Sequence, residues 1–328
     1  MTMQSSPPAH SAARRWRDRA LLALLLAAVA FGLVGLAAAT GWRETWGQIA
    51  RLTAAQAALL LALSSANYLL RGLRWHLFAR RLGLPLAPGA SLRHFLGGFA
   101  MSVTPGRLGE LVRMRWIGRE TGWSFTRAAP LVLMDRAYDL LAMALLLGLA
   151  VALAARGIAG ALPVVALAFG AGVIVTRPRL LAGTLTLAYR ATGRFARAFA
   201  RARAAARSLA RFSHAPTMAA ALGLGLIGWA AEAYSFHLLL GWMGAEVGLW
   251  QAVAIFIFAS LAGGLTGAPG GLGGAEAAMV ALLVAAGVGL EVALAATAVI
   301  RVTTLWFAIG IGLAVFPAAE RISLRGAR

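Results

Sequence analysis

Charged side chains lie inside several of the most apolar stretches of this 328-residue chain. An ionisable residue within a membrane segment is costly, so it is a candidate for binding or transport. The set combines arginines with carboxylates, and arginine recognises phosphate and carboxylate groups through paired hydrogen bonds. The candidate substrate-binding residues are Arg107, Glu110, Arg113, Asp135, Arg136, Asp139, Glu232, Glu276 and Arg301.

Helical spacing brings some of these residues onto shared faces. Glu110 is three residues from both Arg107 and Arg113, and Asp135 and Asp139 are four apart. Residues at these spacings are neighbours on a helix surface. The same charges would also serve as ion pairs that hold broken helices in place with nothing bound. The sequence leaves both interpretations open.

Metal, cofactor and enzyme chemistry find little support. The chain has no cysteine, and its five histidines show no metal-ligand spacing. Asp135 and Asp139 could hold a divalent ion, as in phospholipid head-group transferases, but those enzymes need a second aspartate pair. No Ser-His-Asp set, nucleotide-binding loop or His-Glu metal motif occurs. We therefore expect no catalytic residue, no metal and no cofactor.

Two related motifs interrupt apolar segments with a Pro-Gly pair. Residues 104–110 read Thr-Pro-Gly-Arg-Leu-Gly-Glu, and residues 268–273 read Ala-Pro-Gly-Gly-Leu-Gly, with Glu276 following. Proline is favoured at the first helical position, so half-helices are expected to begin at Pro105 and Pro269. Their N–H groups would point toward the membrane centre and suit an anion. The predicted tips are Thr104, Pro105, Gly106, Pro269, Gly270 and Gly273.

Composition places these motifs in a polytopic membrane protein. The chain is 60% hydrophobic and 13% charged, with a positive mean hydropathy. Its net charge of +20 comes from 31 basic residues, all arginine, against 11 acids. Because the arginines flank apolar segments, the positive-inside rule explains them better than nucleic acid does.

We expect six membrane-spanning helices and two re-entrant hairpins. Each hairpin arm is shorter than the roughly 20 residues that a span needs. The expected spans are 20–39, 54–70, 128–155, 158–176, 217–240 and 292–316, and the hairpins are 91–118 and 250–287. Arg71, Arg74, Arg80 and Arg81 would then close the second span at the cytoplasmic face, and Arg115 and Arg119 would anchor the first hairpin there.

The arginine distribution sets the orientation and the domain plan. Most arginines fall on one side if both hairpins return to their own face, which makes both termini cytoplasmic. The plan is a tail over 1–19, a membrane domain over 20–316 and a tail over 317–328. Segment 177–216 carries nine arginines and no acid, with apolar residues such as Leu187 at helical spacing. We interpret it as a cytoplasmic amphipathic helix on an anionic leaflet; a solvated linker helix is the alternative.

The two halves of the chain correspond with opposite topology. Arg136 lies 31 residues after Pro105, and Arg301 lies 32 after Pro269. The fold class is therefore all-α integral membrane: six transmembrane helices plus two re-entrant broken-helix hairpins arranged as an inverted repeat. Such repeats place the binding site near the midplane. We expect the two tips to meet there, with Arg136 and Arg301 beside them in a polar cavity.

Taken together, these motifs resemble the lysylphosphatidylglycerol synthase transmembrane-region family, also described as flippase-like domain proteins. The resemblance covers about residues 20 to 316. In the best-known members this region translocates aminoacylated phosphatidylglycerol made by a fused synthase domain. Only twelve residues follow the last expected span, so the resemblance implies lipid translocation without lipid aminoacylation.

The resemblance implies a flippase that moves an anionic or zwitterionic phospholipid or glycolipid across the bacterial inner membrane. The alternative is a protein that presents a lipid to a separate lipid-modifying or glycosyl transferase, for example in a hopanoid or glycolipid pathway. Membrane lipids are the expected partners, with a lipid-modifying enzyme and a second copy of the chain as further candidates. We expect no nucleic acid. The second motif has Gly271 where the first has Arg107, so the two hairpins need not bind alike.

Overall fold

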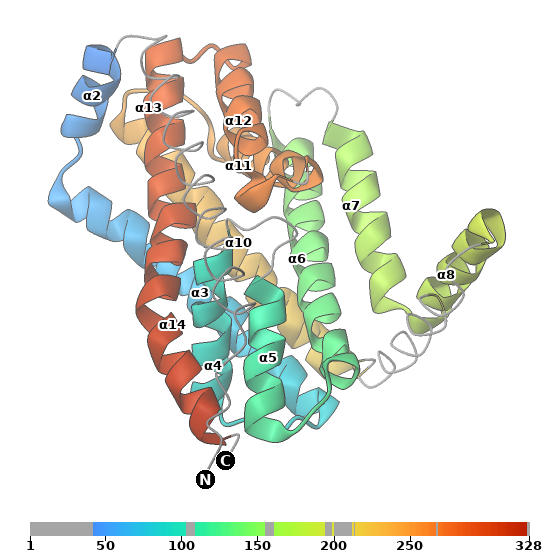
Figure 1. The fold of residues 1–328 in the computed structure, drawn as a ribbon. Helices are drawn as coiled ribbons and strands as arrows, with labels where there is room; N and C mark the ends of the chain where they lie inside the picture. Colours follow the sequence, from blue (N-terminus) through green and yellow to red (C-terminus); the bar gives the residue numbers. More distant parts are fainter. Residues whose placement is uncertain are drawn as a thin grey trace.

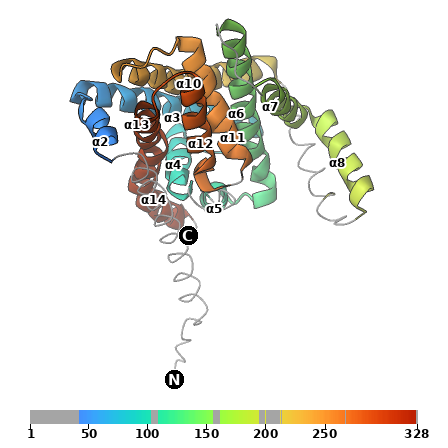
Figure 2. The same cartoon turned by 90° about the horizontal axis from the view of Figure 1, so that it is seen from above.

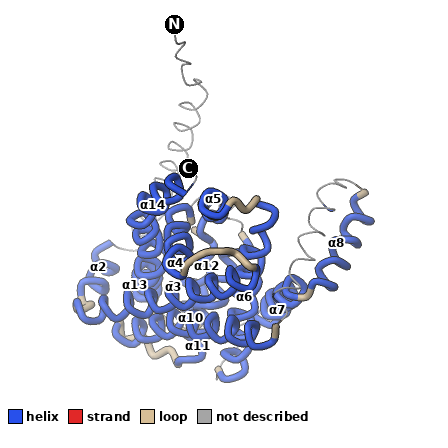
Figure 3. The backbone as a smooth tube through the Cα atoms, turned by 90° about the horizontal axis from the view of Figure 1, so that it is seen from below, coloured by secondary structure: helices blue, strands red, loops and turns tan. Residues whose placement is uncertain are grey.

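The computed structural model describes residues 42–102, 109–154, 161–193, 199, 212, 214–266 and 268–326. This part of the chain is helical throughout and contains no strand (Figure 1; Figure 3). The first expected span, 20–39, lies outside the described residues, as do Thr104, Pro105, Gly106 and Arg107.

The described helices follow the expected order along the chain. Their bounds are α2 Trp42–Ala50, α3 Ala54–Leu82, α4 Pro88–Gly97, η1 Gly98–Met101, α5 Gly109–Thr121, α6 Phe125–Leu153, α7 Ala161–Thr176, α8 Pro178–Thr192, α10 Ala215–Trp242, α11 Leu249–Leu265, η4 Pro269–Gly271, α12 Gly274–Ala285, α13 Leu290–Arg301, η5 Val302–Trp306 and α14 Phe307–Gly326. The turn η5 is π-helical, and α13, η5 and α14 form one continuous helix.

Three described helices are long and apolar enough to cross a membrane: α6, α10 and the continuous helix Leu290–Arg325. The bent pair of α7 and α8 provides a fourth candidate. Helix α3 has 29 residues, but polar side chains interrupt its apolar sequence. The protein is thus an all-α, multi-pass membrane protein. The count of six spans and the inverted repeat stay predictions.

Helix α3 runs well past its expected end. A capping box at Thr53 starts the helix, and Gly83, with a φ of 82°, terminates it. Its 29 residues correspond to about 44 Å, longer than the apolar core of a bilayer. Arg71 and Arg74 do not end the helix as expected, because α3 continues past them to Leu82 and both side chains are buried in the protein. Their expected place at the cytoplasmic face stays a prediction. Helix α3 continues past these two arginines because Asp135 and Asp139 on α6 pair with their charges.

Both expected hairpins are helix–break–helix elements. The first comprises α4, η1 and α5, and the second comprises α11, η4 and α12. In the second break, Gly270, Gly271 and Gly273 have φ values of 62°, 69° and 80°. These left-handed conformations favour glycine and stop a right-handed helix. The half-helix expected to begin at Pro269 therefore begins at Gly274, a correction that the three glycines explain.

Helix α8 projects from the rest of the described helices (Figure 1; Figure 2). It lies at 105° to α7, so it would run along the membrane surface if α7 crosses the membrane. Arg179 and Arg190 lie on one side of α8, and the exposed Ala188 lies opposite. This geometry suits the membrane-surface interpretation of the first part of segment 177–216.

A pair of single-cysteine variants tests the placement of α8, and the cysteine-free chain provides a clean background. In liposomes, Ala188→Cys should react with a membrane-impermeant maleimide about tenfold more slowly than Arg179→Cys, because lipid would cover the apolar side. The two variants should react alike after detergent extraction. Equal rates in liposomes would show a solvated linker helix instead.

Candidate functional site

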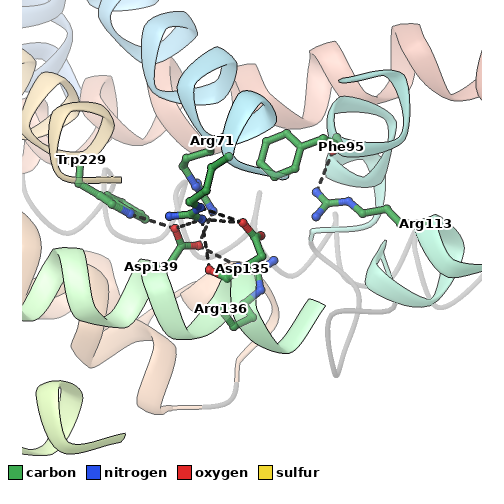
Figure 4. A network of polar contacts seen from close by, with 8 residues as sticks. Arg71, Phe95, Arg113, Asp135, Arg136, Asp139 and Trp229 are labelled. Carbon is green, nitrogen blue, oxygen red and sulfur yellow. Dashed lines mark hydrogen bonds and ion pairs between the residues drawn. The ribbon is translucent and has the colours of Figure 1, made fainter. Parts of the chain in front are cut away.

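An ion-pair network joins α3 to α6 in the interior (Figure 4). The Nη2 atom of Arg74 lies 2.6 Å from Oδ1 of Asp135 and 2.7 Å from Oδ1 of Asp139. The Nη2 atom of Arg71 lies 2.6 Å from Oδ2 of Asp139. The Arg74 side chain is fully enclosed, so this pairing offsets the cost of taking its charge out of water.

The sequence positions this network through helical spacing. Asp135 and Asp139 share one face of α6, as their four-residue spacing predicts. Gly225 lets α10 approach the network, because a Cβ there would lie 2.9 Å from Nη1 of Arg74. Trp229, one turn further along α10, donates from Nε1 to Oδ1 of Asp139 at 3.2 Å.

Arg136 is the open member of the network. Its Nη1 atom lies 3.5 Å from Oδ2 of Asp139, and its side chain is 30% exposed. The Arg71 and Asp139 side chains beside it are almost enclosed. Arg136 is therefore the arginine of this network that is most accessible from outside, whereas Arg71 and Arg74 pair with the aspartates in the interior.

A second polar group connects α13 to the break in the second hairpin. Arg301 donates from Nε to Oε1 of Glu276 at 2.5 Å and from Nη2 to the carbonyl oxygen of Gly270 at 3.0 Å. The side chains of Arg301 and Glu276 are 13% and 12% exposed. Arg301 thus lies beside the second tip, as the sequence predicts. The π-helical turn η5 follows directly, and Tyr68 on α3 donates to its Thr304 carbonyl at 2.5 Å.

The second tip lies against the first hairpin. A Cβ on Gly270 would be 3.6 Å from the carbonyl oxygen of Ser102, which follows η1. Ser102 is the last described residue before the first break. The predicted first tip, 104–106, is outside the described residues, so a meeting of the two tips stays a prediction.

Arg113 belongs to the first hairpin rather than to the aspartate network. It donates from Nη2 to the carbonyl oxygen of Phe95 at 2.8 Å, and its guanidinium lies 4.6 Å from the centre of the Phe95 ring. Figure 4 shows it apart from Asp135 and Asp139. It therefore holds α5 to the end of α4. Glu110 lies in the first turn of α5, but its side chain is outside the described set.

Arg115 and Arg119 connect the first hairpin to helix α14. They lie 2.6 and 2.8 Å from the carboxylate oxygens of Glu320 on α14. Trp116 also donates to Glu320, from Nε1 at 2.7 Å. The sequence analysis missed this acidic partner, and the expected anchoring at the cytoplasmic membrane face stays a prediction.

Glu232 lies on α10, buried at 4% exposure. The side-chain amide of Asn67 on α3 lies beside its carboxyl group. Gly228 allows this approach, because a Cβ there would be 2.5 Å from Oδ1 of Asn67. Among the described residues, no ion pair joins Glu232 to the second hairpin break, where Glu276 pairs with Arg301.

The sequence analysis missed a buried polar stripe on α3. Its successive side chains lie three residues apart, except for one adjacent pair, so they follow one helix face. The members are Ser64, Asn67, Tyr68, Arg71 and Arg74, all buried. That spacing is visible in the sequence and could have revealed the stripe. We call these five residues the α3 polar stripe.

Within the described residues, no three His, Cys, Asp or Glu side chains are grouped to hold a metal ion. The described carboxylates Asp135, Asp139 and Glu276 pair with arginine guanidinium groups.

Comparison with known proteins places the chain in a family. The family model for the lysylphosphatidylglycerol synthase TM region matches residues 20–312. A UPF0104 membrane protein from Methanothermobacter thermautotrophicus (strain Delta H) is 33% identical over 89 residues. That match covers 27% of this chain and 26% of the archaeal protein. With most of its length matched, the chain belongs to the lysylphosphatidylglycerol synthase transmembrane-region family.

Proposed function

We propose that this protein moves a lipid with an anionic or zwitterionic head group between the leaflets of the bacterial inner membrane. The observation that carries the proposal is the unequal exposure of its central arginines. Arg74 is enclosed, whereas Arg136 is 30% exposed and Arg301 is 13% exposed. The enclosed charges form a framework, and the two open guanidiniums provide the contacts for a head group.

The broken hairpins support the same function. Backbone N–H and C=O groups left unpaired at membrane depth cost several kcal/mol each unless protein or water satisfies them. Arg301 binds the Gly270 carbonyl in the second break, and Ser102 lies against the same glycine. A polar passage beside these breaks would satisfy such groups and accept a head group while the acyl chains stay in lipid. An inverted repeat with six spans and cytoplasmic termini completes the proposal.

The chemistry of the candidate residues favours a phosphate-bearing head group. Guanidinium groups bind phosphate oxygens with two parallel hydrogen bonds. Asp139 lies beside Arg136, and Glu276 lies beside Arg301. These carboxylates could in turn accept hydrogen bonds from an amine or hydroxyl on a zwitterionic lipid.

Transbilayer exchange of fluorescent phosphatidylglycerol in liposomes tests this function. Arg136→Gln should lower the protein-dependent exchange rate about tenfold or more, because hydrogen bonds to charged groups are worth about 1.5–3 kcal/mol. The fold should survive, since Arg136 is at the edge of the network. Bleaching of the outer-leaflet probe by dithionite measures the rate.

Arg321→Gln is the matched control, because Arg321 is exposed on α14 and contacts only the Pro317 carbonyl in the described structure. It should leave the exchange rate unchanged. Exchange by the unmodified protein equal to that of protein-free liposomes would refute the proposed function. Equal rates for Arg136→Gln and unmodified protein would remove Arg136 from the pathway.

The family relationship supports a second candidate. The family is named for the membrane region of a lipid-modifying synthase, which favours a protein that presents lipid to a separate transferase. Lipid mass spectrometry of a deletion strain separates the two candidates. Complete loss of a modified lipid supports presentation to an enzyme, whereas accumulation of that lipid on the wrong leaflet supports transport.

A further inference from the structure

Glu232 differs from the other buried acids at the centre of the protein. Asp135, Asp139 and Glu276 each lie within ion-pair distance of an arginine. In the part of the chain that the structure describes, no basic group lies that close to Glu232, although the residue is only 4% exposed. A buried carboxylate without a paired cation is strongly disfavoured, and a bound proton removes that cost.

The immediate surroundings of Glu232 suit both the ionised and the protonated form of its carboxyl group. Asn67 is fully buried beside it, and neither its amide nitrogen nor its amide oxygen makes a hydrogen bond of good geometry in the described structure. An amide donates to a carboxylate through its NH₂ group and accepts from a carboxylic acid through its oxygen. The unused amide of Asn67 is therefore available to Glu232 whether or not the proton is present.

Ser64, one turn before Asn67 on α3, is a second side chain whose hydrogen-bonding groups are unsatisfied. Its side chain is fully buried, its hydroxyl lies beside Tyr68, and no hydrogen bond of good geometry satisfies it. Two buried and unsatisfied side chains on one face are unusual in a folded protein, where such groups nearly always find partners. They leave unused hydrogen-bond donors and acceptors in the surroundings of Glu232.

The charged groups that face Glu232 come from three packed helices. Tyr68 and Arg71 lie on α3, Asp139 lies on α6 and Arg301 lies on α13. Helix α11 also packs against α10 and has no ionisable residue. Arg71 pairs with Asp139 and Arg301 pairs with Glu276, and neither arginine lies within ion-pair distance of Glu232.

Electrostatics links Glu232 to the proposed head-group site. Arg71 and Asp139 of the ion-pair network and Arg301 beside the second break all face Glu232. A proton on Glu232 removes one negative charge from the neighbourhood of these arginines, which favours an anion beside them.

We propose that Glu232 is a proton-binding site and that its proton is taken up and released together with an anionic head group. The coupling rests on the proposed function. The proton adds to one carboxylate oxygen of Glu232 and leaves from it unchanged, so no other reactant is needed. The combined load of one proton and one negative charge crosses the membrane without net charge.

Labelling with dicyclohexylcarbodiimide tests the proton site without requiring transport. This apolar reagent attacks protonated carboxyl groups in apolar surroundings and leaves an adduct that peptide mass spectrometry locates. We expect an adduct on Glu232 of the full-length protein in detergent, with yield falling several-fold between pH 6 and pH 8.5. Glu246, exposed in the loop between α10 and α11, is the internal control and should stay unlabelled.

Two labelling results would overturn the proton site. One is the absence of a Glu232 adduct across the whole pH range. The other is protection by sodium chloride, compared with choline chloride at equal ionic strength, which would identify a sodium site. Both measurements use the unmodified protein, so they do not depend on whether a variant folds.

Transport under a pH gradient tests the coupling. For one proton per lipid, each pH unit should shift the equilibrium distribution of fluorescent phosphatidylglycerol about tenfold between leaflets. Glu232→Gln should abolish this shift, whereas Glu246→Gln should retain it. If the lipid distribution produced by the unmodified protein does not change with the pH gradient, the coupling is overturned.

Failure of the proposed function has a different signature. A protein that moves no lipid in any gradient refutes both transport and coupling, while pH-dependent labelling of Glu232 would still establish the proton site.

Discussion

Replacing Arg74 by alanine should destabilise the protein more than any other exchange of a single charged side chain described above. The substitution leaves Asp135 and Asp139 with reduced compensation in an enclosed interior. Removing one partner of a buried ion pair costs about 3–5 kcal/mol, a large part of the stability of an ordinary domain. We expect aggregation on expression, or a strong fall in the temperature at which the detergent-solubilised protein loses its size-exclusion peak.

Arg80→Ala provides the matched control, because Arg80 is on the same helix and exposed. It should leave the melting temperature nearly unchanged, since exposed ion pairs and charges contribute little. Arg74→Lys should be intermediate, because lysine keeps the charge and loses the planar donors that reach both aspartates. A melting curve of Arg74→Ala that matches the unmodified protein would show that the network contributes little to folding.

Gly312→Leu should separate the last helix from the first hairpin. A Cβ at Gly312 would collide with the backbone nitrogen of Ala100 and lie 2.7 Å from the carbonyl carbon of Phe99. Backbone atoms cannot rotate away as a flexible side chain can, so η1 or α14 must move. Overpacking typically costs about 1–3 kcal/mol, and a backbone clash belongs at or above the upper end.

Gly310→Leu tests whether this effect depends on position. Gly310 is two residues earlier on α14, exposed, and a Cβ there would meet nothing within 4 Å. Thermal unfolding should distinguish the two variants clearly, with only Gly312→Leu destabilised. In the exchange assay, Gly312→Leu should also lose activity if the first hairpin lines the lipid pathway. Equal melting temperatures for the two variants would contradict the close packing described above.

Several features of the site could be predicted because they depend on local spacing. Asp135 and Asp139 share a helix face, and Arg301 lies beside the second hairpin break. Apolar runs too short to span a membrane correctly indicated the break at Pro269–Gly271, whereas the first predicted tip is outside the described residues. In each case the information lies within one element or in a repeated motif.

Other features depend on contacts between distant parts of the chain. Arg71 and Arg74 look like interfacial arginines until α6 provides their acidic partners. The proline rule placed the start of a helix at Pro269, but the backbone of the following glycines moved it to Gly274. Neither result could be read from charge or propensity alone, because tertiary packing and the freedom of glycine outweighed those signals.

The continuous helix that contains η5 has a mechanical consequence. Before the π-helical turn, Arg301 ties this helix to the second hairpin, and after it Gly312 and Glu320 tie it to the first. A movement of either hairpin would therefore act on a different end of this helix. Closing a π-helical turn by one residue would twist one arm relative to the other by about 100° and shift it by about 1.5 Å. A displacement of one hairpin would in this way rotate and shift the end of the helix that contacts the other hairpin. The change of helical geometry would occur at the turn Val302–Trp306.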